Sequence, residues 1–260
     1  MKIIAIANQK GGVGKTTTAI NLCAALSERG LRMLLIDLDP QGNASTGLGI
    51  EPGTRVKTTY DVLLSEAPLT DAIQKTALPS LDIVPSNTDL SSADMELVSN
   101  GRRSFRLRNA LRRADVSAQG YDYVMIDCPP SLSLLTVNAM VAADSVLVPL
   151  QSEFFALEGL SQLMLTVREV RQSANQKLRI EGVVLTMFDI RNRLSQQVEQ
   201  DAREALGELV FETRIPRNVR ISEAPSYGTP VLAYDTQSRG AAAYRALASE
   251  LLDRAVTEAA

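Results

Sequence analysis

Short, mostly apolar runs alternate with longer amphipathic segments along this chain. The apolar runs, rich in Val, Ile and Leu, predict strands at Ile3–Ala7, Met33–Asp37, Leu81–Pro85, Tyr123–Asp127, Ser145–Pro149, Ile180–Met187 and Leu209–Thr213. Apolar residues at helical spacing predict helices at Thr16–Arg29, Ser91–Ser99, Phe105–Ala114, Leu132–Ala142, Leu157–Ser173, Ser195–Leu206 and Ala241–Val256. Because strands that read as continuous apolar runs are buried on both faces, this alternation indicates an α/β fold: a mainly parallel sheet with helices on both faces.

No internal repeat and no low-complexity linker divides the chain. Its 260 residues, 45% of them hydrophobic, suffice for one large α/β domain. The stretch Gly42–Thr59 is rich in Gly, Thr and Pro, and we expect it to be a long loop beside the functional site. We therefore interpret residues 1–260 as a single domain.

Residues 9–17, directly after the first predicted strand, read Gln-Lys-Gly-Gly-Val-Gly-Lys-Thr-Thr and have the spacing of a phosphate-binding loop. Gln9 replaces the first glycine of the usual pattern, whereas Gly14, Lys15 and Thr16 stand at the required positions. The glycines let backbone N–H groups turn toward a phosphate at the positive end of the following helix. Lys15 would reach the β- and γ-phosphates, and the Thr16 hydroxyl would ligate Mg²⁺. The residues expected to bind nucleotide here are Lys10, Gly11, Gly12, Val13, Gly14, Lys15, Thr16 and Thr17.

A second lysine and the absence of a glycine at position 17 further define the kind of nucleotide site that this loop predicts. Lys10 is a second lysine, which suggests a charge directed elsewhere, for example at the nucleotide of another subunit. A dinucleotide-binding G-x-G-x-x-G pattern starting at Gly12 would need a glycine at position 17, where the chain has Thr17. Plain turn glycines would not account for Lys-Thr at this offset between a strand and a helix. The sequence therefore predicts a nucleotide site.

Carboxylates follow two of the predicted strands. Asp37 and Asp39 stand at and just beyond the end of one, and Asp127 ends another. Ligands of an open parallel sheet bind outside the carboxyl ends of its strands, so we expect these groups beside the loop. Asp127 would hold the Mg²⁺ shell through water, as in a Walker B element. Of Asp37 and Asp39, one would orient or polarise the attacking water and the other would support Mg²⁺.

Composition removes several classes of chemistry. The chain has no histidine, which excludes Ser-His-Asp and Cys-His hydrolysis, His-ligated zinc and imidazole acid–base catalysis. Phosphoryl transfer remains, because positioning and electrostatics supply most of its catalysis. A net charge of −3 does not by itself indicate nucleic-acid binding. Cys23 and Cys128 form no metal-binding pattern, and we expect both to be packing residues.

The sequence also argues against a membrane partner. No stretch approaches the roughly 20 apolar residues that span a bilayer, and the first strand begins directly after Lys2. The segment Ala248–Ala260 carries three acidic side chains against Arg254 alone, which is a poor match to an anionic membrane. We therefore expect a cytoplasmic protein.

Several motifs together resemble a known family. The loop at 10–17, Asp-Leu-Asp-Pro-Gln-Gly-Asn at 37–43 and Ile-Asp-Cys-Pro-Pro-Ser at 126–131 resemble the deviant-Walker P-loop ATPases. Within that group, Ile-Pro-Arg-Asn-Val-Arg-Ile-Ser-Glu-Ala-Pro-Ser at 215–226 and the stretch 234–240 are similar to the ParA/Soj partition branch. The similarity extends over essentially the whole chain.

This resemblance implies a single-domain P-loop ATPase that uses ATP and Mg²⁺. It implies a nucleotide-sandwich homodimer that binds double-stranded DNA without sequence preference and associates with the nucleoid. Such a protein segregates a chromosome or plasmid together with a ParB-like activator. The alternative within the family is the positioning of a protein cargo, such as a chemotaxis cluster, over the nucleoid.

The family roles fall on particular residues of this chain. Lys10 would contact the partner subunit's ATP, Lys15 the phosphates, and Asp39 would be tied to hydrolysis. The expected catalytic residues are thus Lys10, Lys15 and Asp39, and the expected metal ligands are Thr16, Asp39 and Asp127. Pro216 and Asn218 would lie around the adenine, and Arg191 and Arg220 would contact DNA.

Other interpretations of these features remain open. Scattered arginines also suit a solvated surface, and Arg102–Arg113, with six arginines, is a second basic segment that could share a DNA role. A membrane-surface regulator of division is disfavoured by the acidic end of the chain. A binding module without hydrolysis is disfavoured by Lys15, Asp39 and Asp127.

Overall fold

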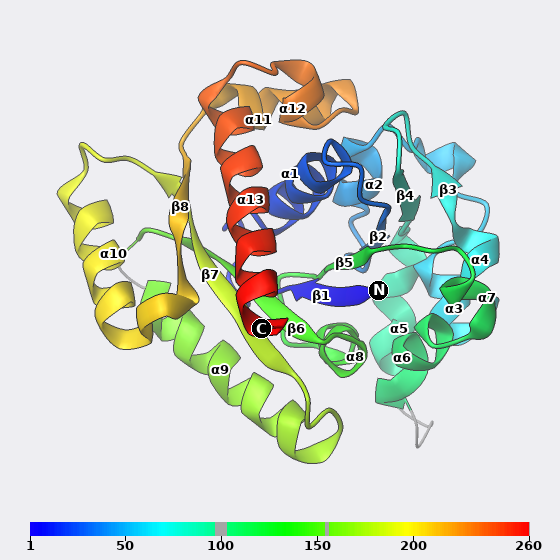
Figure 1. Ribbon diagram of the computed structural model, residues 1–260. Coiled ribbons are helices and arrows are strands. Elements are labelled where there is room, and N and C mark those ends of the chain that lie inside the picture. The colour runs from blue at the N-terminus through cyan, green and yellow to red at the C-terminus, as the bar shows by residue number, and fades with distance from the viewer. Residues whose placement is uncertain (97–102, 154–155, 260) are drawn as a thin grey trace.

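The computed structural model describes residues 1–96, 103–153 and 156–259. One sheet contains strands β1 Lys2–Ile6, β2 Met33–Asp37, β3 Gln74–Lys75, β4 Leu81–Val84, β5 Tyr123–Asp127, β6 Ser145–Gln151, β7 Arg179–Phe188 and β8 Val210–Pro216. Their order across the sheet is β3-β4-β2-β5-β1-β6-β7-β8 (Figure 1). Neighbouring strands are parallel except for β3, which is antiparallel to β4. The predicted mainly parallel α/β fold is confirmed.

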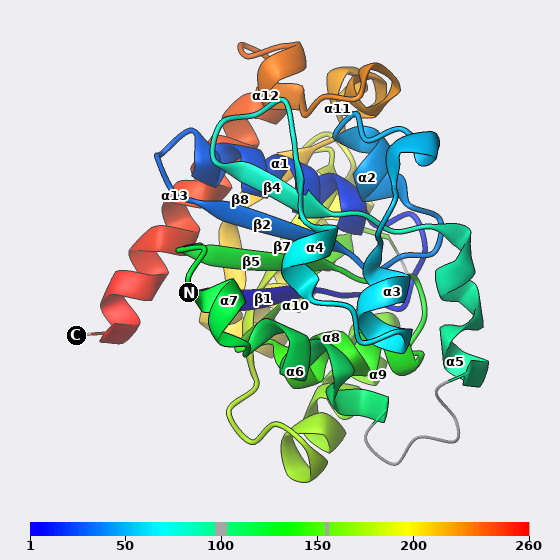
Figure 2. The same ribbon diagram turned by 90° about the vertical axis from the view of Figure 1, so that its right-hand side faces the viewer.

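Helices lie on both faces of the sheet (Figure 2). They are α1 Lys15–Ser27, α2 Asn43–Gly47, α3 Thr59–Leu64, α4 Leu69–Ala72, α5 Ala93–Glu96, α6 Arg106–Leu111, α7 Ala114–Ser117, α8 Leu134–Ala142, α9 Ala156–Ser173, α10 Arg193–Leu206, α11 Val219–Glu223, α12 Val231–Tyr234 and α13 Arg239–Ala259. Among the described residues, no helix is long and apolar enough to cross a membrane.

The apolar side chains form a separate core on each face. In β1, Ile3 and Ala5 belong to the core that includes residues of α3, α6, α8, α9 and α10, whereas Ile4 and Ile6 belong to the core that includes residues of α1, α2 and α13. Successive side chains of a strand point to opposite faces, so a strand covered on both sides must be apolar at consecutive positions. This is the physical reason for the apolar runs that predicted the strands.

The elements missed by the sequence pattern are short. Strand β3 has two residues, and α2, α3, α4, α11 and α12 have no more than six each. The predicted helix Phe105–Ala114 is wrong in its extent, because α6 ends at Leu111 and a separate α7 follows. The predicted helix Ser91–Ser99 is described only as far as residue 96, where α5 ends.

The expectation of a long loop over Gly42–Thr59 is wrong in part. Helix α2 begins directly after Gly42, and a 3₁₀ turn follows at Pro52–Thr54. Arg55 fastens the segment by donating to the carbonyl oxygens of Ile50 (2.8 and 3.1 Å) and Ser86 (3.0 Å). The segment is therefore held by α2 and by one arginine that supplies several donors.

The edge strand β8 is bound by side chains along its length. Glu250 of α13 accepts hydrogen bonds from the backbone N–H groups of Glu212 (2.8 Å) and Thr213 (2.9 Å). Arg254 donates to the carbonyl oxygen of Val210 at 3.0 Å and to Glu250 at 2.9 Å. Arg203 of α10 donates to the carbonyl oxygen of Phe211 at 3.1 Å. Helices on both faces therefore hold this strand through its backbone.

Candidate nucleotide site

The loop between β1 and α1 lies at the carboxyl edge of the sheet, as predicted. Gly12 and Gly14 have φ values of 75° and 85°, a left-handed conformation that glycine adopts without strain. Gly14 precedes α1 and supplies no side-chain cap, so the first N–H groups of the helix remain available to an anion. Thr186 of β7 donates to the carbonyl oxygen of Val13 at 2.8 Å and ties the loop to the sheet.

Lys15 lies inside the loop rather than in solvent. Its side chain is buried, and Nζ donates to the carbonyl oxygen of Lys10 at 2.9 Å. Burial lowers the pKa of Lys15, while the nearby Asp127 carboxylate opposes that shift. The lysine therefore stands beside the glycines that would receive a phosphate, with a carboxylate close by.

Three carboxylates gather at the ends of the two adjacent strands β2 and β5. Asp37 and Asp127 are register partners, and both are fully buried. Asp37 accepts hydrogen bonds from the N–H (2.8 Å) and hydroxyl (2.6 Å) of Ser45 in α2. Burial raises the pKa of Asp37 to about 6, although the Ser45 hydrogen bonds oppose the rise. Asp37 is thus held in place by α2, which lies within the segment expected to be a loop.

Asp127 is the group left unsatisfied. Neither of its carboxylate oxygens has a hydrogen-bond partner among the described residues. Burial raises its pKa well above the ordinary value and the charge of Asp37 adds to the rise. The Thr16 hydroxyl opposes the rise, because it lies close to the carboxylate even though it does not meet hydrogen-bond geometry. A buried carboxylate without partners is costly unless a ligand or cation completes it.

A Mg²⁺ ion fits this arrangement. Asp127 offers two unpartnered oxygens, Thr16 a hydroxyl and Asp39 a nearby carboxylate, and Mg²⁺ prefers oxygen ligands of these kinds. Asp39 is itself buried, and its Oδ1 accepts the Gln41 N–H at 3.0 Å. The residues predicted as metal ligands are therefore brought together at one edge of the sheet.

A pocket of about 310 Å³ continues from the loop toward β8. Gly14 and Thr17 line this pocket together with Pro216 and Asn218, the two residues predicted to lie around the adenine. The Asn218 Oδ1 caps α11 by accepting the Arg220 N–H at 2.9 Å, so its amide nitrogen is the group left for a ligand. Tyr244 of α13 also lines the pocket, and its hydroxyl lies 3.4 Å from that of Thr18. The pocket joins the phosphate loop to the predicted base-binding residues.

Lys10 points away from its own loop. Its Nζ forms an ion pair with Glu153 Oε2 at 2.6 Å, and both side chains are partly exposed. The sequence did not predict Glu153 as a partner, and no local pattern marks it. The sequence also did not predict α2, which carries Ser45, because a helix of five residues shows no periodicity.

The predicted DNA-contacting arginines are both exposed and both paired within the chain. Arg191, in the turn before α10, lies 3.0 Å from Asp189, and its side chain is 86% exposed. Arg220 lies 2.9 Å from Glu223 and 3.3 Å from Asp235. The hydrogen bond to Asp189 raises the pKa of Arg191, and the hydrogen bond to Glu223 raises the pKa of Arg220.

The second basic segment, Arg102–Arg113, is partly engaged in local contacts. Arg102 lies outside the described residues. Arg106 pairs with Glu66, and Arg108 lies over the ring of Phe105 at 5.7 Å. The segment is therefore a basic surface with several intramolecular partners.

The fold and this loop define the chain as a P-loop nucleotide-binding protein. A family model described as "AAA domain" matches residues 1–180. The chain is 60% identical to the chromosome partitioning protein ParA of Caulobacter vibrioides over 255 residues, covering 98% of this chain and 95% of that protein. It is 52% identical to the sporulation initiation inhibitor protein Soj of Bacillus subtilis over 250 residues, covering 96% and 98%.

A solved structure gives the same picture of the fold. A Mycobacterium smegmatis protein described as cobyrinic acid a,c-diamide synthase, with bound ADP and magnesium, superposes with a TM-score of 0.83 at 37% identity, covering 97% of this chain and 94% of that one. The chain belongs to the ParA/Soj family of partition ATPases.

Proposed function

We propose that this protein is a Mg²⁺-dependent ATPase that dimerises with ATP, binds double-stranded DNA without sequence preference, and segregates a chromosome or plasmid with a ParB-like activator. The observation that carries the proposal is the meeting of Lys15, the unsatisfied Asp127 and a base-sized pocket at one edge of the sheet. The ParA and Soj relatives, named for chromosome partitioning and sporulation control, support the biological role.

The described residues fit separate tasks in hydrolysis. The α1 N–H groups and Lys15 would bind the β- and γ-phosphates, and Pro216 and Asn218 would position the base. Thr16, Asp39 and Asp127 would hold Mg²⁺, which neutralises phosphate charge when bound. Asp39 would orient the attacking water, because Asp37 already accepts three hydrogen bonds from Ser45 and the Asp39 N–H. This contrast supports Asp39 rather than Asp37 in the hydrolytic role.

The dimer would be completed by Lys10. It is directed away from its own phosphate loop, toward Glu153, and would contact the partner subunit's nucleotide. A two-fold dimer would carry Arg191 and Arg220 twice and so contact twice as many phosphates. A chain of net charge −3 could then bind DNA once ATP has dimerised it. We infer that residues 1–260 act as one domain and that the protein is cytoplasmic and nucleoid-associated, without a membrane partner.

Positioning of a protein cargo over the nucleoid is the second candidate. This function would use the same nucleotide and DNA surfaces and would differ only in the partner protein. The neighbouring gene therefore separates the two candidates. A gene for a ParB-like protein indicates DNA segregation, and chemotaxis genes indicate cargo positioning.

The test of the proposed function is Asp39→Ala. We expect it to bind ATP with unchanged affinity, to lose hydrolysis, and to accumulate as an ATP-bound dimer on DNA. Equilibrium dialysis with labelled ATP measures the affinity, phosphate release measures hydrolysis, and light scattering with DNA co-sedimentation measures the bound dimer. The exposed Asp89→Ala serves as a control. Normal turnover by Asp39→Ala would move the water-orienting role to Asp37 or a backbone group.

A further inference from the structure

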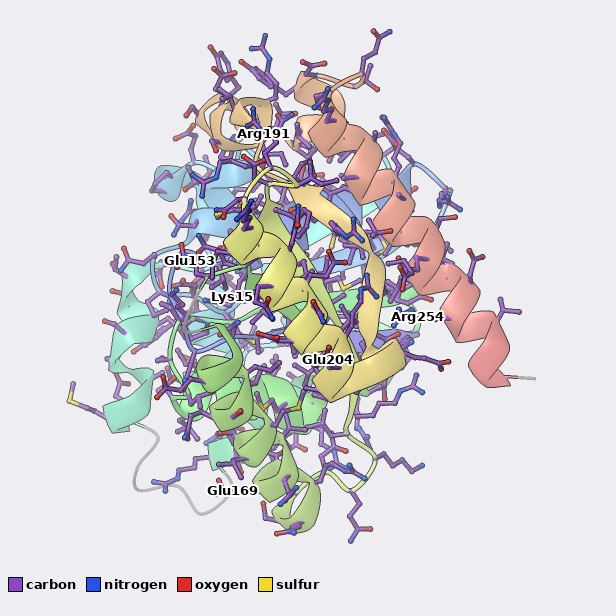
Figure 3. The ribbon with its side chains drawn as sticks, turned by 90° about the vertical axis from the view of Figure 1, so that its left-hand side faces the viewer. Lys15, Glu153, Glu169, Arg191, Glu204 and Arg254 are labelled. Atoms are coloured by element: carbon purple, nitrogen blue, oxygen red, sulfur yellow. The ribbon has the colours of Figure 1, made fainter. Side chains whose placement is uncertain are left out.

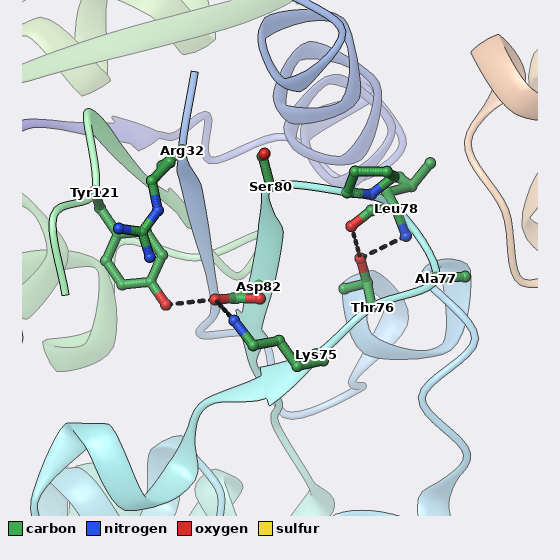
Figure 4. A pocket seen from close by; sticks show the side chains of 9 residues that line it. Arg32, Lys75, Thr76, Ala77, Leu78, Ser80, Asp82 and Tyr121 are labelled. Carbon is green, nitrogen blue, oxygen red and sulfur yellow. Dashed lines mark hydrogen bonds and ion pairs between the residues drawn. The ribbon is translucent and has the colours of Figure 1, made fainter. Parts of the chain in front are cut away.

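A second pocket lies at the opposite edge of the sheet from the nucleotide site. Its volume is about 460 Å³, and it is bounded by Arg32, Tyr121 and the connection 75–82 (Figure 4). Arg32 immediately precedes β2, and Asp82 is the second residue of β4, so the pocket lies at the amino ends of these parallel strands. It shares no residue with the nucleotide pocket.

The one carboxylate in this pocket is already neutralised. Asp82 is buried, and its Oδ2 accepts hydrogen bonds from the Tyr121 hydroxyl at 2.6 Å and from Lys75 Nζ at 2.7 Å. Burial raises the pKa of Tyr121, so the phenol keeps its proton and remains the donor. Lys75 reaches this carboxylate from solvent, since its side chain is 79% exposed.

Arg32 provides the second cation of this pocket. Its guanidinium lies over the Tyr121 ring at 5.5 Å, and among the described residues it forms no ion pair. Stacking on a ring leaves the edge of a guanidinium free, and its planar set of donors matches the oxygens of a phosphate. Lys75 and Asp82 form an ion pair, so Arg32 is the charge lining this pocket that has no ion-pair partner among the described residues, with Asp122 accepting its backbone N–H alongside.

The walls of the pocket are fixed by hydrogen bonds. The Met33 N–H donates to the Ser80 carbonyl oxygen at 2.7 Å, and the Arg32 N–H donates to Asp122 Oδ2 at 2.8 Å. Thr76 donates through its hydroxyl to the Leu81 carbonyl oxygen at 2.7 Å. Ser80 adopts φ 63°, which is uncommon for a residue other than glycine and is typical of constrained segments. A pre-formed cavity of this kind needs little reordering to bind a ligand.

We propose that this pocket binds a small organic phosphate. The phosphate would lie against Arg32 at the side facing Lys75, and the organic part would lie against the apolar wall made by Leu78 and Pro79. The volume falls within the range of roughly 300–1,000 Å³ that small-ligand pockets occupy. This site is independent of the proposed ATPase function, because it lies at the other end of the strands.

The experiment is a calorimetric titration of the full chain with phenyl phosphate, after the nucleotide loop has been saturated with Mg²⁺ and ADP. We expect saturable binding of one phenyl phosphate per chain, weaker binding of inorganic phosphate, and a roughly tenfold or greater loss of affinity in Arg32→Gln. Arg29→Gln, which removes an exposed arginine outside this pocket, should bind like the unaltered chain.

A second variant separates binding from folding. Arg32→Lys keeps the charge but loses the planar stack, so it should bind phenyl phosphate with intermediate affinity. It provides the comparison if Arg32→Gln fails to fold. Thermal melting and ADP affinity report whether each variant is intact. Absence of saturable phenyl phosphate binding to the unaltered, ADP-saturated chain would overturn the proposal, and so would equal affinities in the unaltered chain and a folded Arg32→Gln or Arg32→Lys variant.

Discussion

At the scale of single residues, Asp127 opposes folding at neutral pH. Its carboxylate is buried, lacks hydrogen-bond partners among the described residues, and lies beside Asp37. A raised pKa in the folded protein means that stability falls as pH rises through the range where the group ionises. Asp127 therefore lowers the stability of the ligand-free protein, and binding of Mg²⁺ with nucleotide would remove this loss of stability.

Asp127→Asn should reveal this cost. We expect the variant without ligand to melt several degrees above the unaltered chain at pH 7.5, because about 1 kcal/mol corresponds to roughly 2–4 °C for a chain of comparable size. Its gain in melting temperature on adding Mg²⁺ and ADP should be smaller. Differential scanning calorimetry with and without ligand measures both. Equal ligand-induced shifts in the two proteins would remove Asp127 from the metal site.

Lys15 should be required for nucleotide binding. It is the buried cation nearest the loop glycines, and its loss removes charge-assisted hydrogen bonds to the phosphates. Lys15→Gln should weaken ATP binding by roughly 10- to 100-fold. Equilibrium dialysis with labelled ATP measures the affinity, and the exposed Lys177→Gln serves as control. Unchanged binding and hydrolysis would contradict the assignment.

The ion pair between Lys10 and Glu153 should compete with dimerisation. If Lys10 has to leave Glu153 to reach a partner's nucleotide, Glu153→Gln should lower the ATP-dependent dimer dissociation constant by roughly two- to fivefold, the range expected for an exposed pair. Lys10→Ala should abolish the dimer and leave ATP binding largely intact. Analytical ultracentrifugation with ATP measures both.

Glu169→Gln is the matched control for Glu153→Gln. It makes the same change of charge near the end of α9 that lies away from Glu153 (Figure 3). It should dimerise like the unaltered chain. A dimer that forms equally well with and without the Glu153 carboxylate would show that the pair does not restrain Lys10.

At the scale of elements, long segments were predictable and short ones were not. Strands β2 and β5 match their predicted bounds, because a strand covered on both faces needs apolar residues at every position. The five residues of α2 cannot show a helical period, and their place depends on contacts with Asp37 and Arg55 that lie apart in sequence. One missed helix did carry a signal: Thr58 and Asp61 form a capping box at the start of α3.

The same distinction holds for the functional site. The phosphate loop and the carboxylates after strands were predictable, because the topology of a parallel sheet brings strand ends together. The partners that orient them were not. Ser45, Glu153 and Thr186 reach the site from separate elements, and nothing local in the sequence pairs them with Asp37, Lys10 and Val13.

Glu250 should make the attachment of α13 to β8 dependent on pH. Burial by itself would raise the pKa of Glu250, but the N–H groups of Glu212 and Thr213 and the charge of Arg254 bring it below the ordinary value. A lowered pKa in the folded protein stabilises it above the unfolded pKa of about 4.3, and this contribution is lost as pH falls through the folded value.

Glu250→Gln should therefore cost about 1–2 kcal/mol at pH 7 and progressively less below about pH 4.5. Urea unfolding at pH 3.5–7 gives the difference between variant and unaltered chain. Glu208→Gln, at an exposed position in the same region, should follow the unaltered chain at every pH. A difference that does not change with pH would show that the carboxylate charge is not what holds β8.

At the scale of the whole molecule, DNA binding should depend on both nucleotide and salt. Arg191→Glu with Arg220→Glu should reduce the salt dependence of DNA affinity by roughly 0.9 per lost phosphate contact and weaken all sequences alike. The exposed pairs with Asp189 and Glu223 would exchange for phosphates. Fluorescence anisotropy with ATP over a salt series measures the slope.

Arg168→Glu with Arg171→Glu makes the same change of charge on α9 and separates a local contact from a general effect. This control should keep most of the affinity and the original slope. If both double variants behave alike, DNA is held elsewhere, and the segment Arg102–Arg113 is the next region to change.

The two edges of the sheet also decide how copies of this protein can join. β3 offers two residues, and the backbone of β8 is occupied by Glu250, Arg254 and Arg203. An open edge strand is a template on which a second chain can extend the sheet into a fibre, and here one edge strand is short and the other has several of its backbone groups bound by side chains. In the proposed dimer, subunits would then meet through side chains and the bound nucleotide, and hydrolysis of that nucleotide would reverse the association.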